Sequence, residues 1–288
     1  MLDILIFVAG GIILGLIWVM LYDSNRFVVR NYVISDPRIR QDCRMVVVAD
    51  LHDKCYGQNN LSLIDAIKEQ KPDLIMVAGD ILTARPKEKL KKALTFVEEI
   101  LKIAPVCYGN GNHEHRLKLY PETYGTLAEE YEEGLEKLGI HRLVNAYTVF
   151  LEKGIAVYGS EIDREYYKRG FLVKMDEHYL EGLLGKADES LYTILIAHDP
   201  DYFKNYAGWG ADLNLSGHVH GGIIRVPFIG KGLLSPAVRL FPKYDGGLFE
   251  EEKKKMIVSR GLGSHTIPFR LFNPGELVVV DLKSGQES

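Results

Sequence analysis

Beyond its N-terminal region, the chain alternates short apolar runs with amphipathic segments. Residues 45–48, 74–78 and 106–108 are continuous apolar runs, which are typical of strands buried on both faces. Between them, residues 61–70 and 88–103 carry apolar side chains three and four positions apart, and this spacing predicts amphipathic helices. This order of strands and helices predicts a parallel sheet with right-handed crossovers.

The later part of the chain has shorter, β-like apolar runs. Helices are expected there at residues 125–138 and 174–184. Strands are expected at residues 148–151, 155–159, 192–197, 212–215, 223–226, 256–259 and 276–280. No internal repeat or long linker divides this region, so we predict one α/β domain over residues 41–288. In it, two mixed β-sheets pack as a sandwich flanked by helices. Residues 26–40 are expected to be a connector.

The longest apolar run lies at the N-terminus. Residues 4–22 carry no charged side chain, and about 20 residues suffice to cross the hydrocarbon core of a bilayer. A cleaved signal peptide would require a basic start and a small-residue cleavage pattern. Residues 1–3 and 23–26 provide neither, so we predict a retained N-terminal transmembrane helix over residues 1–25.

Charge and cysteine content bear on orientation and partners. Five arginines follow the apolar run within residues 26–44, and only the N-terminal amine precedes it. The positive-inside rule therefore predicts a single-pass cell-membrane protein with its domain in the cytoplasm, the extracytoplasmic face being the alternative. The three cysteines, Cys43, Cys55 and Cys107, are too few and too irregular for a disulfide framework, which fits a reducing compartment. A net charge of −4 gives no basic field, so we expect no nucleic-acid partner.

Polar residues of one kind follow five of the apolar runs. These stretches are Asp50-Leu51-His52, Gly79-Asp80, Gly111-Asn112-His113-Glu114, His198 and Gly217-His218-Val219-His220-Gly221-Gly222. The carboxyl ends of neighbouring strands form the edge where open α/β sheets bind ligands. Carboxylates, imidazoles and an amide oxygen suit divalent ions such as Mn, Fe or Zn. One such stretch alone could be an ordinary turn, but five in this order predict a metal site.

In this order the five stretches resemble the calcineurin-like metallophosphoesterases. The resemblance implies two divalent metal ions per chain, with manganese favoured over iron or zinc. It implies that Asp50, His52 and His220 hold the first metal. It further implies that Asp80 bridges the two metals, and that Asn112, His198 and His218 hold the second. A hydroxide that bridges the metals would then attack phosphorus in line, so no protein base is needed.

The resemblance gives His113 a different role, as the acid that protonates the leaving oxygen. In the best-studied phosphatases of the family, an aspartate three residues after the bridging carboxylate orients this histidine. Thr83 stands at that position here, and Glu114 is not an obvious replacement. The partner of His113 is therefore open, and this departure disfavours a protein-phosphatase function.

Two later segments are candidates for substrate or membrane contact. Residues 261–270 resemble a segment of the membrane-associated bacterial branch of the family, in which Ser264, His265 and Arg270 would bind substrate. The alternative is a structural Gly/Pro loop. Residues 223–241 are rich in apolar side chains interspersed with basic ones, so they form either a loop that rests on a bilayer or ordinary core and turn.

Taken together, these features predict a membrane-anchored, dinuclear metal-dependent hydrolase. Its substrate would be a phosphoester or pyrophosphate, plausibly of a phospholipid or a lipid-linked nucleotide. Some members of the resembling group hydrolyse a UDP-linked acylated glucosamine in lipid A biosynthesis, which makes that compound a candidate. A phosphoprotein or nucleotide phosphatase is the enzymatic alternative. A non-catalytic metal-binding scaffold is the alternative of another class, but it would be expected to lack ligands, and here every motif position is filled.

Overall fold

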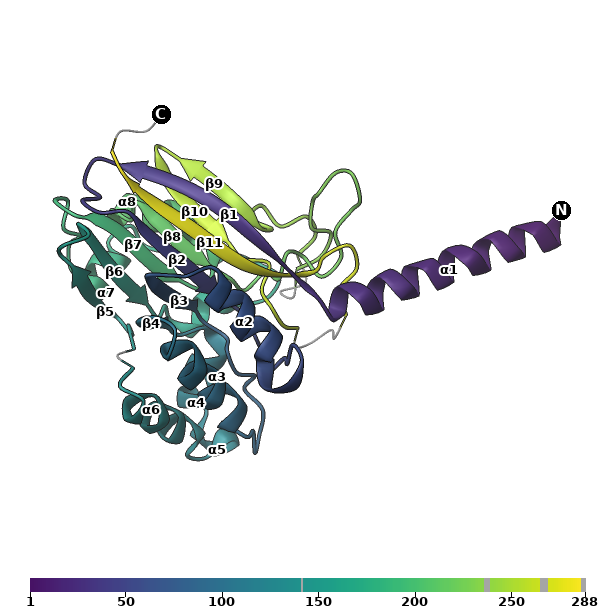
Figure 1. Cartoon of the computed structure of the whole chain (residues 1–288), viewed down its shortest axis with the longest axis horizontal. Coiled ribbons are helices and arrows are strands. Elements are labelled where there is room, and N and C mark those ends of the chain that lie inside the picture. Colours follow the sequence, from purple (N-terminus) through teal and green to yellow (C-terminus); the bar gives the residue numbers. More distant parts are fainter. Residues whose placement is uncertain (141, 236–238, 265–268, 286–288) are drawn as a thin grey trace.

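The computed structural model describes residues 1–140, 142–235, 239–264 and 269–285. Two β-sheets form its centre (Figure 1). The first sheet has the strand order β1-β11-β2-β3-β4, and the second has the order β5-β6-β7-β8-β10-β9. Strands of the first sheet are β1 (Phe27–Asp36), β2 (Cys43–Val48), β3 (Leu74–Ala78), β4 (Val106–Gly109) and β11 (Gly275–Ser284). Strands of the second are β5 (Ala146–Phe150), β6 (Ile155–Ser160), β7 (Tyr192–Ala197), β8 (Leu213–Ser216), β9 (Gly247–Glu251) and β10 (Lys254–Val258).

Both sheets mix parallel and antiparallel pairs. Strands β2, β3 and β4 run parallel, as the alternation of strands and helices predicts, and β11 joins β2 antiparallel. In the second sheet, β6, β7, β8 and β10 are parallel, while β5 and β9 pair antiparallel at the two edges. The predicted fold class, two mixed sheets in a sandwich flanked by helices, is confirmed.

The helices lie on the outer faces of the sandwich and around the site. They are α2 (Leu61–Glu69), α3 (Lys91–Leu101), α4 (Asn112–Leu119), α5 (Pro121–Tyr124), α6 (Leu127–Lys137), α7 (Tyr179–Leu184) and α8 (Phe203–Trp209). Three short 3-10 turns accompany them, at η1 (Gln58–Asn60), η2 (Arg164–Tyr167) and η3 (Pro200–Tyr202).

Successive side chains of one strand show how the layers form. On β2, Val46 and Val48 pack in a core shared with α2, α3 and α6, whereas Met45 and Val47 pack against the second sheet. This alternation follows from the two-residue period of a strand. A third core joins the other face of the second sheet to α7 and α8. Strands buried on both faces therefore appear in the sequence as continuous apolar runs.

Several expectations from the sequence are wrong. The predicted connector, residues 26–40, contains β1, which pairs in parallel with β11 along its whole length. Residues 223–226 form no strand but only isolated bridges, from Ile224 to Leu271 and from Arg225 to Gly232. The helix expected from residue 174 begins at Tyr179. The sequence reading also missed α4, α8 and β9.

The N-terminal helix α1 (Leu2–Ser24) projects away from the sandwich (Figure 1). It is long and apolar enough to cross a membrane, and none of its most apolar 18-residue window is buried against the domain. A signal sequence would meet the same criteria. At its base, Asp23 accepts hydrogen bonds from Arg26 and from the main-chain N–H of Asn273. The oxygen of Ser24 likewise accepts the N–H of Arg270, so the end of the helix is joined to the segment before β11.

Candidate metal centre

The five predicted stretches meet at one edge of the sandwich. Asp50 follows β2, Asp80 follows β3, and Asn112 follows β4 as the first residue of α4. From the second sheet, His198 follows β7, and the loop after β8 carries two further histidines, His218 and His220. Both sheets therefore supply side chains to one buried cluster.

The backbone of this cluster is unusual. Asp50, His52, Asp80, His218 and His220 all have positive φ, between 48° and 69°. Such values are uncommon outside glycine and concentrate at functional sites. The neighbouring Gly111 is required by crowding, because a Cβ there would lie 2.2 Å from Asp80 Oδ1. The loops thus adopt a costly conformation that turns these side chains toward each other.

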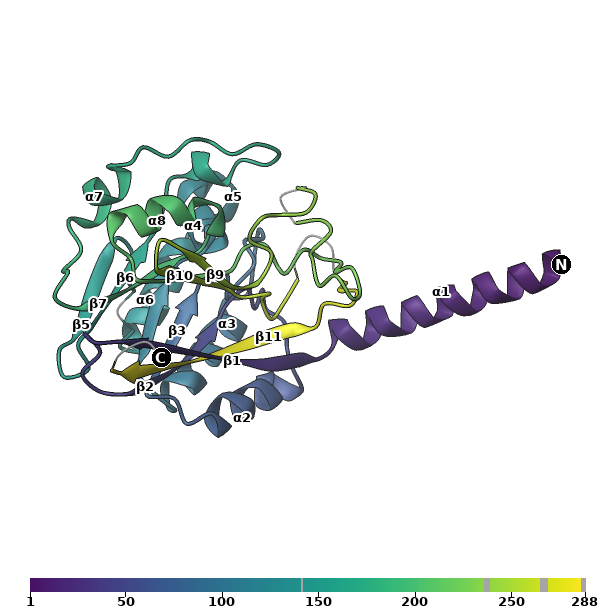
Figure 2. The same cartoon turned by 90° about the horizontal axis from the view of Figure 1, so that it is seen from above.

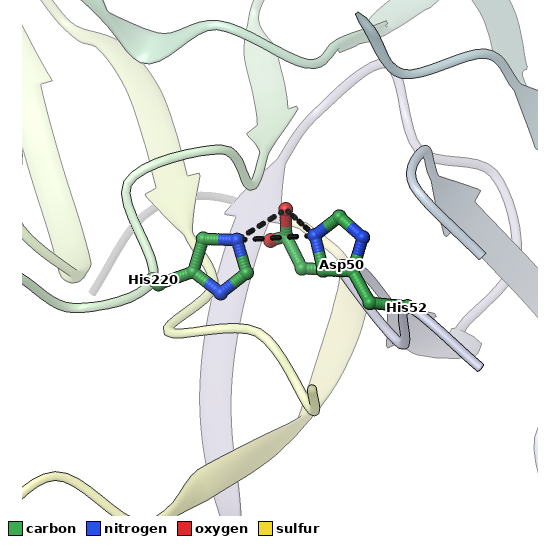
Figure 3. Close-up of side chains that lie close together, drawn as sticks. All are labelled: Asp50, His52 and His220. Carbon is green, nitrogen blue, oxygen red and sulfur yellow. Dashed lines mark hydrogen bonds and ion pairs between the residues drawn. The ribbon is translucent and has the colours of Figure 1, made fainter. Parts of the chain in front are cut away.

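Three side chains that the resemblance assigns to a first metal lie together (Figure 3). The Nε2 atoms of His52 and His220 are 3.2 Å apart. Asp50 Oδ1 is 3.5 Å from His220 Nε2 and 3.9 Å from His52 Nε2. His220 Nδ1 lies 3.1 Å from the carbonyl oxygen of Gly263, which leaves Nε2 directed inward as an electron-pair donor. Two ring nitrogens that face each other beside a carboxylate fit a cation between them.

Asp80 lies between this group and the remaining side chains. Its Oδ2 atom is 3.7 Å from His52 Nε2 and 3.1 Å from His198 Nε2. Its other oxygen accepts the main-chain N–H of His113 at 2.8 Å. A carboxylate that reaches both groups has the position that a bridging ligand needs.

Asn112, His198 and His218 complete the second group. Asn112 Oδ1 is 2.8 Å from His218 Nδ1, and the rings of His218 and His198 have centroids 5.3 Å apart. His198 Nδ1 lies 2.7 Å from the carbonyl oxygen of Ala78, so its Nε2 is directed into the cluster. The hydrogen bond to Ala78 fixes the orientation of the His198 ring. Metal-binding histidines are commonly held by such a bond from the ring nitrogen that does not bind the metal.

The charged groups of the cluster shift one another's pKa values. Burial raises the pKa of Asp50 to about 7, and the nearby Asp80 adds to this rise. Burial also opposes the charged form of His198, but the carboxylates of Asp80 and Asp50 outweigh it and raise the pKa of the imidazole to about 10. His198 and His113 in turn hold the pKa of Asp80 well below its usual range despite its burial. Buried carboxylates that need nearby positive charge fit divalent cations, so the donor set suits the metals that the family implies.

His113 has a main-chain partner where the sequence suggested a missing carboxylate. The N–H of Ala84 donates to His113 Nδ1 at 2.9 Å, and the ring stands edge-on to His52 with centroids 4.9 Å apart. An accepting Nδ1 places the proton of the neutral ring on Nε2. Thr83 itself donates its N–H to Asp53 and gives His113 no carboxylate.

The sequence reading missed the role of Glu114. Its carboxylate is buried and accepts the main-chain N–H groups of Asp80, Ile81 and Gly111 at 2.9 to 3.0 Å. Tyr108 donates a further hydrogen bond at 3.2 Å. Glu114 therefore joins the loops after β3 and β4. Glu114 stands three residues after Gly111, which caps the start of α4. This spacing was the signal that could have revealed the role of Glu114 in binding main-chain N–H groups.

The predicted substrate-binding residues are placed differently. Arg270 is buried, and its guanidinium donates to main-chain oxygens of Arg260, Gly261 and Gly263. It therefore holds the segment before β11, as the structural-loop alternative expects. Ser264 is partly exposed at the end of this segment, and His265 lies outside the described residues.

A two-sheet sandwich with histidines and carboxylates clustered at its strand ends is the arrangement expected of a dinuclear metallophosphoesterase. Consistent with this, the sequence model of the calcineurin-like phosphoesterases matches residues 43–222. The chain belongs to this family and is a metal-dependent phosphoesterase, as the motifs predict.

Curated relatives give the same family, and one solved structure is reported beside them. The uncharacterized metallophosphoesterase YkuE of Bacillus subtilis (strain 168) is 30% identical over 248 residues, which are 84% of this chain and 79% of YkuE. The phosphodiesterase YaeI of Escherichia coli (strain K12) is 28% identical over 228 residues, which are 77% of this chain and 75% of YaeI. The protein TT1561 of Thermus thermophilus resembles the fold with a TM-score of 0.45 and 10% identity, over 77% of this chain and 92% of that one.

Proposed function

We propose that two divalent metal ions bind at this edge of the sandwich and that the site hydrolyses a phosphoester or pyrophosphate bond. The proposed ligands of the first metal are Asp50, His52 and His220, and those of the second are Asn112, His198 and His218, with Asp80 between the two. The observation that carries the proposal is the convergence of ligand atoms. Those of Asp50, His52 and His220 lie within 4.8 Å of one another, and so do those of Asp50, Asp80 and His198. Manganese is the metal we expect.

The proposed chemistry assigns separate roles to the bound metals, to His113 and to Asp80. Metals bound there would lower the pKa of a water molecule and polarise the phosphoryl group. His113 is proposed to donate its Nε2 proton to the leaving oxygen, since its Nδ1 is occupied by the N–H of Ala84. Asp80 helps to hold this residue in place by accepting its main-chain N–H.

A membrane location is supported by two features at the same end of the domain. Helix α1 is exposed and apolar, and Trp18 and Tyr22 stack near its C-terminal end with centroids 5.4 Å apart, as interfacial aromatic residues would. The loops that follow β8 lie near the base of α1 (Figure 2). In this segment the side chains of Phe228 and Ile229 are exposed. This loop is bridged to the segment that holds α1, through Ile224 and Leu271. A phospholipid or lipid-linked pyrophosphate is therefore the proposed substrate, on the cytoplasmic side of the cell membrane.

A substrate panel tests this function. The full chain in detergent, supplied with Mn²⁺, would be assayed against phosphomonoesters, phosphodiesters and pyrophosphates, with and without a lipid group. We expect activity that EDTA abolishes and that is highest on lipid-linked compounds. Activity restricted to soluble monoesters would contradict the lipid substrate, and a purified protein without transition metal would favour the scaffold alternative.

A further inference from the structure

A basic, tyrosine-rich pocket lies beside the metal centre. It has a volume of about 670 Å³ and lies between α4, α5 and η2. Its wall contains four cationic side chains and three tyrosines but no carboxylate. The residues that matter most here are Arg116, Tyr120, Arg164, Tyr167, Lys168 and Arg169.

Two contacts place this pocket next to the proposed second metal. Arg116 stands four positions after Asn112 on the same helix, so the two side chains lie on one face of α4. The ring of Tyr167 stands edge-on to that of His218, with centroids 5.3 Å apart. A substrate group in the pocket would therefore border on the phosphoryl group at the metals.

The cations of the pocket lack local counter-charges. No carboxylate of the described residues lies within ion-pair distance of Arg116, Arg164, Lys168 or Arg169. Arg164 instead donates to the hydroxyl of Tyr120 at 2.8 Å and lies 5.4 Å from the centre of that ring. Arg116 Nε is buried and has no hydrogen-bond partner. Four cationic side chains that line one pocket favour a bound anion.

Two of the carboxylates near the pocket are bound to other partners. Glu161 accepts the side-chain amide of Asn110 at 2.7 Å. Asp163 accepts the hydroxyl of Tyr179 at 2.9 Å. Apart from the Nε–H of Arg164, which donates to Tyr120, the guanidinium donors of the pocket can therefore serve a ligand. The planar geometry of a guanidinium matches the paired oxygens of a phosphate.

We infer that this pocket binds a second phosphate of the substrate, the one that is not attacked at the metals. This inference deepens the proposed function and rests on it. The substrate is then a pyrophosphate diester: water adds to one phosphorus, the P–O–P bond breaks, and the leaving phosphate keeps the bridging oxygen and its electron pair. That oxygen accepts a hydrogen bond from His113 and leaves without a proton, since the second pKa of a phosphate monoester is about 6. A proton of the attacking water is released to solvent, and the products are two phosphate monoesters. The leaving monoester stays in the pocket until it is released.

The test compares selectivity between substrates with one and two phosphates. The full chain in detergent with Mn²⁺ would be given bis(p-nitrophenyl) phosphate, a UDP-sugar and a dialkyl pyrophosphate. The variants are Arg116→Ala, Arg116→Lys and the double change Arg164→Gln with Arg169→Gln, the last two sites being exposed. Lys118→Ala is the matched control, because Lys118 is an exposed cation on the same helix but outside the pocket.

We expect kcat/KM for two-phosphate substrates, relative to the one-phosphate substrate, to fall at least tenfold in Arg116→Ala and in the double variant. Arg116→Lys should keep much of this selectivity for two-phosphate substrates, and Lys118→Ala should have the selectivity of the parent chain. A loss on the UDP-sugar alone identifies a nucleotide phosphate as the ligand, and a loss on both compounds identifies any second phosphate. Unchanged selectivity in both pocket variants overturns the inference. A parent chain that cleaves only bis(p-nitrophenyl) phosphate overturns it as well but leaves the phosphoesterase standing, whereas one that cleaves none of the three contradicts the proposed function itself.

Discussion

Glu114 Oε2 accepts the main-chain N–H of Asp80 at 2.9 Å, so a buried glutamate outside the proposed ligand set fixes the loop that carries the central carboxylate. Its other oxygen accepts the N–H of Ile81. Burial, together with the charge of Asp80, raises the pKa of Glu114 to about 7. Three N–H donors nevertheless favour a carboxylate that accepts at every position.

Replacement of Glu114 by Gln should therefore disturb the site without removing a ligand. Either orientation of the amide sets its NH₂ group against main-chain donors, which costs about 1–3 kcal/mol of unfolding free energy. We expect a lower midpoint in thermal unfolding and a reduced metal content. Tyr108→Phe removes the hydroxyl that bonds to Glu114 and to Tyr131 but leaves the three main-chain hydrogen bonds of Glu114 in place, so it should have a smaller effect on metal content. Equal metal content and stability in Glu114→Gln and the parent chain would show that the loop does not depend on this carboxylate.

Asp80→Asn should release both metals. Asp80 lies close to His52 of the first group and to His198 of the second, so its loss weakens two sites together. We expect elemental analysis to find little metal and turnover to be abolished. Metals at a hundredfold excess over their dissociation constants stabilise the fold by about 2.7 kcal/mol, so EDTA should lower the unfolding temperature of the parent chain but not of the variant. Asp53→Asn, in the loop that also carries His52, is the control that should retain metal.

His113→Ala should slow turnover and leave metal binding intact. A general acid contributes roughly 10²- to 10⁴-fold to rate, and most when the leaving group is a poor one. The loss should therefore be large for an alkyl phosphodiester and small for a p-nitrophenyl ester, whose leaving oxygen needs no proton. Metal content near the parent value distinguishes this variant from Asp80→Asn. An equal loss of turnover on both esters would contradict the assignment of His113 as the acid.

Much of the site could be predicted because its residues follow buried strands. Asp50 and Asp80 each end a continuous apolar run, and the order of the motifs indicated the family. The partner of His113 could not be predicted in this way, since the main-chain N–H of Ala84 leaves no mark on side-chain patterns. Arg270 was misread for a related reason: its charge suggested phosphate, whereas its partners are carbonyl oxygens.

The first strand, β1, could not be predicted from the pattern of apolar residues. Residues 27–36 lack a buried apolar run, because β1 lies at the edge of its sheet and its side chains are mostly part-exposed. Its partner β11 lies at the other end of the chain, with Phe27 opposite Gly275. Such a pairing is specified by the completed sheet and not by neighbouring residues.

Asp36 provides a test of pH dependence away from the site. Burial alone would raise its pKa, but hydrogen bonds from Arg38, at 2.8 to 2.9 Å, hold it below the usual value of 3.8. A lowered pKa in the folded state contributes stability above the unfolded value, and that stability is lost as the pH falls through the folded pKa. Asp36→Asn should thus lower the unfolding free energy by about 1 kcal/mol or less at neutral pH, since the pair is partly screened by solvent. Denaturant unfolding at several pH values should show the difference from the parent shrinking below pH 3.8. If the difference in unfolding free energy between Asp36→Asn and the parent stays constant down to acid pH, Asp36 does not contribute this pH-dependent stability.

Asn273 joins the base of α1 to a proposed metal ligand, and this predicts that the two are coupled. Its side-chain amide donates to the carbonyl oxygen of His220 at 2.7 Å, and its main-chain N–H donates to Asp23 at 3.1 Å. Since groups that orient ligands typically change metal affinity 10- to 100-fold, Asn273→Ala should weaken binding of the first metal by about tenfold. The dissociation constant of the metal would be measured by calorimetric titration of the full chain.

Asn205→Ala is the matched control for this change. Asn205 also donates its side-chain amide to a main-chain oxygen, that of Met175, but on the far side of the second sheet. Because Asn273 is fully buried and Asn205 only part-buried, Asn273→Ala should lose more stability. Only Asn273→Ala should lose metal affinity. Asp23→Asn would then report whether the helix base contributes: a smaller loss of affinity in the same direction means that the orientation of α1 is transmitted to His220. If Asn273→Ala binds metal as tightly as Asn205→Ala, the loop of His220 is held without the helix and the coupling is absent.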